Sequence, residues 1–377
     1  MLDFFTDLFH DARRQLPMKS FGQRLLAIRY VVTMGRKCAW RTLKDWIKIV
    51  IGRRPYLPQV LNNRERSLFV WQYALHLSGL RRLRKITCVG VPKEGPGSHA
   101  LMVMDAINFA RVSGLTYVHM PFTVIHHADR PTEEWLAGWE TLFNLGAGEI
   151  MYDPKESRIV SHAHTSDALE VCFGWSHRGD ELHQSFKAMD PEFRHKYYLN
   201  KSPRPTKDVT VAVHVRRGYD VSPEDYLFTS TDSILRTVTL VSGLLDAHNI
   251  RHNISVYSEG NATDWADIPE LGLSKYMVGR YSDGTSDLSR LNSESVLDID
   301  AFRAMQALIE ADILIMSKSL FCYYAAVISD GIKIFELGGL RQPLDEWLLR
   351  AADGSFDRSA FERQLSLLIQ SKTASPK

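Results

Sequence analysis

The hydrophobic pattern of the chain alternates between strand and helix periods from residue 86 onward. A short β-branched run at 86–91 is followed by a loop with glycines and prolines at 92–99. Apolar residues at helical spacing then predict a helix over 100–114, and a second strand follows at 115–122. Strand, helix and strand in this order form a βαβ unit, which implies a parallel sheet.

A second series of the same kind follows residues 199–207, a Pro-, Ser- and Lys-rich stretch that we interpret as an interdomain linker. Its predicted elements are strand 209–215, helix 232–247, strand 253–258, helix 300–310, strand 312–317, helix 320–329 and strand 332–337. We therefore predict an α/β fold with two doubly wound, Rossmann-like domains that face a cleft. The expected limits are a helical N-terminal extension at 1–85, α/β domains at 86–203 and 204–345, and a C-terminal helix at 346–377.

Basic charge is concentrated in residues 18–54, which carry ten Lys or Arg and one acidic residue, Asp45, in a chain of net charge +2. Apolar residues recur there at helical spacing, and one stripe includes Trp40 and Trp46. Such a helix either lies on an anionic membrane surface or packs its stripes on the protein's own core. No run of eighteen uncharged apolar residues exists, so a membrane-spanning helix is not expected.

Composition excludes several other classes of protein. Hydrophobic residues make up 45% of the chain and charged residues 24%, which are ordinary values for a globular protein and not for a disordered one. Outside the basic segment the chain is mildly acidic, so we expect no nucleic-acid partner. The four cysteines have no CxxC spacing, which favours a reducing compartment, and we expect a cytoplasmic protein, peripheral on the inner face of a membrane if the basic segment binds lipid.

The first candidate site is the segment His214-Val215-Arg216-Arg217-Gly218, at the carboxyl end of a strand apolar enough to be buried. In open α/β sheets, ligands bind outside such strand ends. Guanidinium groups match phosphate oxygens in a bidentate manner, so this segment suits a diphosphate. The competing interpretation is that the two arginines form salt bridges with acidic neighbours.

Three further segments combine polar residues or glycines with a strand end. Ser258 and Glu259 follow one strand and suit a ribose or sugar hydroxyl, although polar turns are common there. The segment from Ser317 to Ser319 opens a helix, where it either binds an anion or only caps the helix. The loop containing Gly95 and Gly97 matches neither a P-loop nor a GxGxxG fingerprint, and a glycine turn alone would also explain it.

Three of these segments, in this order, resemble the fucosyltransferase superfamily of GT-B glycosyltransferases. "HVRRG" at 214–218 is similar to the HxRRGD motif of the donor domain. "SKSLFCYYAAVI" at 317–328 is similar to the serine-rich helix start of that domain, and "GPGSHALMVMDAINFAR" at 95–111 to the glycine-rich segment of the acceptor domain. The resemblance covers about residues 90 to 345 and leaves the first 85 residues outside.

The resemblance implies an inverting transfer of a sugar, fucose from GDP-fucose in most members, to a hydroxyl of a glycan or a lipid-linked oligosaccharide, without a metal or other cofactor. The donor residues that it implies are Arg216 on the departing phosphate with Arg217 in support, His214 facing the nucleotide, Glu259 on the donor, Ser319 in the phosphate turn and Asp300 on the guanine. The general base stays open among His99, Glu94, His127 and Asp129, with His99 taken as the catalytic candidate.

The chain also departs from the family pattern. Tyr219 separates Gly218 from Asp220, and Leu320 and Cys322 replace two serines. The alternative is therefore a protein that binds a nucleotide sugar or glycan on the same scaffold after losing catalysis. A phosphate-handling α/β enzyme unrelated to glycans is a third possibility, which the absence of both phosphate-loop motifs disfavours.

Overall fold

The computed structural model describes residues 83–88, 94–126, 128, 130–156, 160–163, 179–201, 208–217, 225–258, 301–338 and 341–374. The basic segment at 18–54 lies outside these ranges, so its helices stay a prediction. Contacts divide the chain into two compact units: unit 1 takes 1–94, 99–126 and 143–196, and unit 2 takes 95–98, 127–142 and 197–377.

Unit 1 contains a four-stranded parallel sheet in the order β3-β2-β1-β4. Its strands are β1 (Lys85–Cys88), β2 (Thr116–His119), β3 (Ile150–Met151) and β4 (Val160–Ala163), and a short 3-10 helix, η1 (Pro154–Glu156), precedes β4. The helix α4 (Pro96–Val112) follows β1, and α7 (Gly179–Tyr198) comes after β4. Apolar residues lie all around α4, and this explains why nearly the whole helix is buried.

Unit 2 contains a five-stranded sheet in which every neighbouring pair is parallel, in the order β6-β5-β7-β8-β9. Its strands are β5 (Val209–Val215), β6 (His252–Ser258), β7 (Ile313–Ile315), β8 (Ile332–Glu336) and β9 (Leu348–Arg350). Its helices are α8 (Thr231–Ala247), α9 (Ala301–Glu310), α10 (Leu320–Ile328) and α11 (Arg358–Ala374), besides α5 (Thr132–Phe143) from the first half of the chain.

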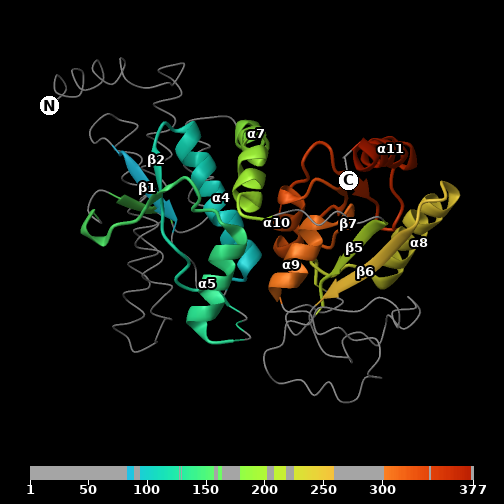
Figure 1. Ribbon diagram of the computed structural model, residues 1–377, viewed down its shortest axis with the longest axis horizontal. Helices are drawn as coiled ribbons and strands as arrows, with labels where there is room; N and C mark the ends of the chain where they lie inside the picture. The colour runs from blue at the N-terminus through green and yellow to red at the C-terminus, as the bar shows by residue number, and fades with distance from the viewer. Residues whose placement is uncertain are drawn as a thin grey trace. The chain divides into compact units, whose positions relative to one another are not determined.

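Helices cover both faces of the unit 2 sheet (Figure 1). Alternate residues of β5, from Val209 to Val215, pack with Ile234 of α8 and Phe361 of α11 in one buried core. The intervening residues point to the opposite face because side chains alternate along a strand. His214 is one of these, and its ring stacks on Phe321 of α10. The sheet is therefore doubly wound, and its two buried faces explain why β5 reads as an almost continuous apolar run.

The helix α5 packs on α9 within unit 2. Trp135 and Trp139 are both buried, and their ring centroids lie 5.3 Å and 4.6 Å from that of Phe302. A Cβ atom at Gly138 would lie 2.4 Å from the Phe302 ring, so a glycine allows this close approach. The segment from Trp135 to Trp139 predicts the beginning of a helix but not its partner, because no local period identifies which sheet a helix joins.

The predicted α/β class with two parallel Rossmann-like sheets is confirmed, and the strand at 209–215 has the predicted bounds. Two elements were missed, β4 and α7, and the C-terminal segment holds the short strand β9 before its helix begins at Arg358. A strand of three residues is too short to show a period. The domain limits stay predictions.

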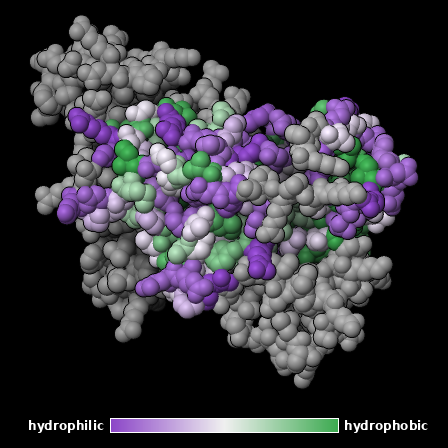
Figure 2. Space-filling model, in the orientation of Figure 1, coloured by the Kyte–Doolittle hydropathy of each residue, from purple (hydrophilic) through white to green (hydrophobic). Residues whose placement is uncertain are grey.

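The surface of the described residues is mainly hydrophilic on the face shown in Figure 2, with hydrophobic residues in small separate areas. Ile150 and Met151 of the edge strand β3 are 52% and 55% exposed. Within the described ranges, no helix combines the length and the apolar character that crossing a membrane requires.

Candidate functional site

The order of the five-stranded sheet reverses direction at β5. From β5 the chain crosses to β6 on one side, and it later returns to β7 on the other side of β5. Because Val213 is in register with Ile315, the carboxyl ends of β5 and β7 lie at the same edge. Ligands of doubly wound sheets bind outside the carboxyl ends at this reversal point. The segments that follow Val215 and Ile315 therefore form the candidate site.

His214 joins the two strand ends. Its Nδ1 atom lies 2.7 Å from the Ser317 Oγ atom, and its ring stacks on Phe321 with a centroid distance of 5.8 Å. The residue is 5% exposed, and burial, with the nearby charge of Arg216, lowers its pKa to about 3. The imidazole is consequently neutral near pH 7, so it links the two segments by a hydrogen bond and adds no charge of its own.

Arg217 is turned inward and bound by the protein itself. Its Nη1 atom donates to the carbonyls of Arg216 (2.9 Å) and Thr229 (3.0 Å), and its Nη2 donates to the Thr231 hydroxyl at 3.0 Å. The guanidinium also lies 4.2 Å from the centroid of the Phe228 ring, and the residue is only 3% exposed. Arg217 thus ties the end of β5 to Thr229 and Thr231 at the beginning of α8, which is a structural role.

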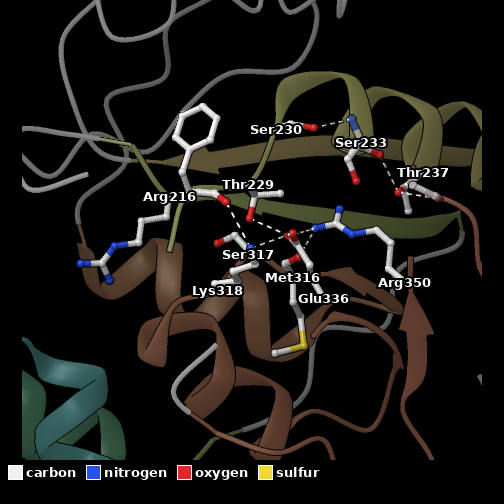
Figure 3. A network of polar contacts seen from close by, with 12 residues as sticks. Arg216, Thr229, Ser230, Ser233, Thr237, Met316, Ser317, Lys318, Glu336 and Arg350 are labelled. Atoms are coloured by element: carbon white, nitrogen blue, oxygen red, sulfur yellow. Dashed lines mark hydrogen bonds and ion pairs between the residues drawn. The ribbon is translucent and has the colours of Figure 1, made fainter. Parts of the chain in front are cut away.

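The side chain of Arg216 points in a different direction, although Arg216 directly precedes Arg217 in the chain. It is partly exposed, and in Figure 3 its side chain points away from the contacts around Glu336. Its charge lies close enough to lower the pKa of His214 and to oppose the effect of burial on Cys322. Of the two arginines, Arg216 is the more exposed, and its role at a phosphate stays a prediction.

The turn between β7 and α10 is tightly held. The Ser319 N–H donates to the Ser317 carbonyl at 2.8 Å, and the Ser319 hydroxyl accepts from the Phe321 N–H at 3.3 Å as the N-cap of α10. The Cys322 thiol contacts the carbonyls of Ser317 (3.2 Å) and Ser319 (3.3 Å). Burial raises the pKa of this thiol to about 11, so it stays protonated and can donate.

The glycine loop of the first half of the chain lies against the beginning of α10. A Cβ atom at Gly97 would lie 2.6 Å from the Phe321 Cα atom and 2.7 Å from the Leu320 carbonyl oxygen. Gly95 and Gly97 both belong to unit 2. Close approach of two backbones, and not an unusual dihedral angle, is the reason for glycine at 97. The structure therefore brings the three segments of the resemblance that contain Gly97, His214 and Ser317 to one place.

Two charged residues that the sequence analysis missed, Glu336 and Arg350, lie beside this turn and its Lys318. Glu336, the last residue of β8, accepts from the Arg350 Nη2 atom at 2.5 Å and from the Thr229 hydroxyl at 2.7 Å through its Oε2 atom (Figure 3). Its Oε1 atom lies 3.2 Å from the Lys318 Nζ atom. Arg350 also donates to the Met316 carbonyl at 3.1 Å. The available signal was a charged residue at the end of each apolar strand.

The other predicted residues are placed as follows. Ser258, fully buried, ends β6 in register with Val215, so it borders the same edge. His99 belongs to unit 1, is 1% exposed and meets the Phe122 ring edge to face at 6.1 Å. The remaining candidates lie outside the described residues: Gly218, Glu259, Asp300, His127 and Asp129. Among the described residues, no group of three His, Cys, Asp or Glu side chains is arranged to hold a metal ion.

No family model matches the chain. No curated protein matches it by sequence. Among solved structures, it is similar to the fucosyltransferase NodZ from Bradyrhizobium, with 13% identity and a TM-score of 0.28 over 65% of this chain and 94% of that one. It is also similar to POFUT1 in complex with GDP, with 10% identity and a TM-score of 0.31 over 66% and 96% of the two chains.

A third similar structure is an Arabidopsis thaliana FUT1 variant in complex with GDP, with 11% identity and a TM-score of 0.28 over 74% of this chain and 79% of that one. Because all of these TM-scores are low, we take no function from the similarities. The proposal that follows is supported by the chain's own residues.

Proposed function

We propose that this protein is an inverting glycosyltransferase that transfers a sugar from a nucleotide-diphosphate donor, GDP-fucose, to a hydroxyl of a glycan or a lipid-linked oligosaccharide. One observation carries the proposal. The 2.7 Å contact between His214 and Ser317 joins the HVRRG segment to the turn between β7 and α10, Ser317–Ser319, which we call the SKS turn. The contact lies at the reversal point of a doubly wound sheet. This point lies where such sheets bind nucleotides, and Arg216 provides a positive charge there.

The reaction that we propose forms one bond and breaks another. The acceptor oxygen attacks the anomeric carbon of the sugar, and the bond between that carbon and the β-phosphate oxygen breaks with its electron pair going to the phosphate. The acceptor hydroxyl loses its proton to a base, for which His99 is the proposed residue. The developing phosphate charge requires fixed positive groups, and such electrostatic stabilisation commonly dominates catalysis.

The described residues have separate tasks in this scheme. Arg216 binds the departing phosphate, and the beginning of α10 offers backbone N–H groups to the same anion. His214 is neutral and holds the SKS turn against the end of β5. Arg217 fixes the loop that contains Thr229. We propose that metal ions are not required, because arginine replaces them at the phosphate.

The departure from the serine pattern at Cys322 leaves the turn intact. The thiol contacts two carbonyls of the turn, at Ser317 and Ser319, as a serine hydroxyl would. The substitution is therefore no sign that the donor turn has been lost. A protein that only binds the donor would also keep this turn, so turnover separates the two functions.

Donor binding is tested by thermal shift of the full chain with GDP, UDP, CMP and ADP, for the wild type and for Arg216→Ala. A ligand at 100 times its Kd stabilises the folded state by about 2.7 kcal/mol, which gives a readily measured rise in Tm. We expect stabilisation by GDP and its loss in Arg216→Ala. A preference for another nucleotide would exclude GDP-fucose as the donor, and no response to any of the four would overturn the donor site.

Catalysis is tested separately from binding. GDP release from GDP-fucose, measured with and without a panel of glycan and lipid-linked acceptors, should increase when the correct acceptor is present. Stabilisation by GDP without release under any of these conditions would instead support the binding protein.

We further propose that residues 18–54 attach the protein to an anionic membrane surface at the cytoplasmic face. Ten basic residues in this segment would each contribute about 1 kcal/mol near such a surface. Flotation with vesicles of phosphatidylcholine alone and with added anionic phospholipid tests this contact. Binding that requires the anionic lipid and falls with salt supports it, and no binding to either vesicle rejects it.

A further inference from the structure

Two cations and one carboxylate, Lys318, Arg350 and Glu336, form a cluster at the turn between β7 and α10. Glu336 contacts Arg350 and Thr229 through Oε2, at 2.5 Å and 2.7 Å, and contacts Lys318 through Oε1 at 3.2 Å. These residues come from the ends of three strands and from the loop after β5, and together they carry a surplus of one positive charge. A surplus charge in a partly buried place is unfavourable unless an anion balances it.

The two cations differ in how firmly they are bound to Glu336. The Arg350 side chain is fully buried, so its charge has no access to water and depends on Glu336. The Lys318 side chain is 16% exposed, and its contact with the carboxylate is longer. If Lys318 moved away, Glu336 would keep Arg350 and Thr229 on its other oxygen. Lys318 is therefore the cation that the cluster can release.

Lys318 belongs to the turn that borders the candidate site. It stands between Ser317 and Ser319, directly before the first turn of α10. Besides Glu336, its Nζ atom donates to the Phe228 carbonyl at 3.3 Å. An ammonium group has three N–H donors, and within the described part of the chain these are its two partners. One donor is thus available to a further acceptor.

We propose that Lys318 is a phosphate-binding residue of the donor site, and that Glu336, neutralised by Arg350, holds it in position until the phosphate arrives. This inference rests in part on the proposed function, because the anion is taken to be the diphosphate of the donor. On binding, the ammonium exchanges the Glu336 carboxylate for a phosphate oxygen, while Arg350 and Thr229 stay on Glu336.

The experiment is isothermal titration of the full chain with GDP and, separately, with inorganic pyrophosphate. The variants are Lys318→Met, Lys318→Arg and the control Lys372→Met. Lys372 is a suitable control because it also pairs with a carboxylate of unit 2, Asp312 at 2.7 Å, and is 24% exposed, but it lies at the opposite edge of the sheet. We expect Lys318→Met to weaken both ligands about tenfold or more, Lys318→Arg to recover most of the affinity, and Lys372→Met to have no effect.

The outcomes separate this inference from the proposed function. If Lys318→Met binds GDP as tightly as the wild type does, the inference is wrong and the proposed transferase function is unaffected. If pyrophosphate binding depends on Lys318 but GDP binds no more tightly than pyrophosphate, Lys318 binds phosphate and the donor is not a GDP-sugar. Equal weakening by Lys318→Met and Lys372→Met would show a general charge effect and overturn the inference, as would binding of neither ligand to the wild type.

Discussion

The five-stranded sheet has an amino edge, where its parallel strands begin, and a carboxyl edge, where they end. These two edges differ in their balance of charge. At the amino edge, Asp312 accepts from the Thr210 N–H and hydroxyl at 2.8 Å and 3.0 Å, and Lys372 balances its charge. Asp208 and Arg251 form a second matched pair there at 3.3 Å.

At the carboxyl edge, Glu336 is the carboxylate of a cluster with two cations, and two arginines follow β5 nearby. Among the described residues, the two ion pairs at the first edge are balanced, whereas the cluster at the second edge has one excess positive charge. The difference agrees with our proposal that the carboxyl ends of these parallel strands, and not their amino ends, bind an anion.

The largest expected difference between the edges concerns their carboxylates. Glu336→Gln should lower the free energy of unfolding by about 3–5 kcal/mol, because it leaves the buried Arg350 without its counter-charge. Asp312→Asn should cost about 1 kcal/mol, because Lys372 can reach water and the amide oxygen can still accept from Thr210. The midpoint and slope of urea-induced unfolding measure both. Equal losses would contradict the contrast.

The second expected difference lies within the carboxyl edge, between its two arginines. Arg216→Ala should lower kcat by about 10²–10³-fold with little loss of stability, since its charge acts on the ligand. Arg217→Ala should lower the free energy of unfolding by about 1–3 kcal/mol, because the Thr229 carbonyl loses a buried donor.

Urea unfolding and GDP-fucose turnover separate these two effects. The exposed Arg251 at the amino edge provides the control, and Arg251→Ala should change neither quantity. The two roles would have to be exchanged if Arg217→Ala lost activity while keeping its stability.

Two glycines permit a close approach of backbones, one at each edge. Gly331→Ala would place a Cβ atom 2.3 Å from the Ala311 carbonyl oxygen, and Gly97→Ala would place one 2.6 Å from the Phe321 Cα atom. Each should cost about 1–3 kcal/mol of stability through overpacking. Only Gly97→Ala should also weaken GDP binding, because it displaces the first turn of α10. If Gly331→Ala weakened GDP binding as much as Gly97→Ala, the two edges would not differ in their effect on the ligand.

The smallest expected effect is a pH dependence from His214. Its pKa is about 3 in the folded protein and near 6.5 when unfolded, so the unfolded state binds more protons between these values. The stabilising contribution of the neutral His214 side chain is therefore fully present above the unfolded pKa. It decreases as the pH is lowered, by about 1 kcal/mol between pH 6 and pH 5. The difference between wild type and His214→Gln across that range measures it, and parallel pH profiles would show that His214 does not contribute.

Much of the fold follows from patterns that are local. Five apolar residues among the seven from Val209 to Val215 predict a strand buried on both faces, and the structure has a strand with those bounds. The charged residues directly after it point to the carboxyl end of that strand. Local periods predict such elements because each depends on a few consecutive residues.

Other features required the register of elements that are far apart in the chain. Lys318, Glu336 and Arg350 meet because β7, β8 and β9 are parallel neighbours, and no short-range pattern relates them. The same holds for α5, which joins the second unit through Phe302.

Finally, Arg216 and Arg217 are adjacent and chemically identical, so the sequence by itself predicted two cations at the end of a buried strand. Only the tertiary structure decided that one binds the loop at Thr229 and the other points away from it. The physical reason is that successive side chains leave the backbone in different directions, and the partners that each one meets come from distant parts of the chain.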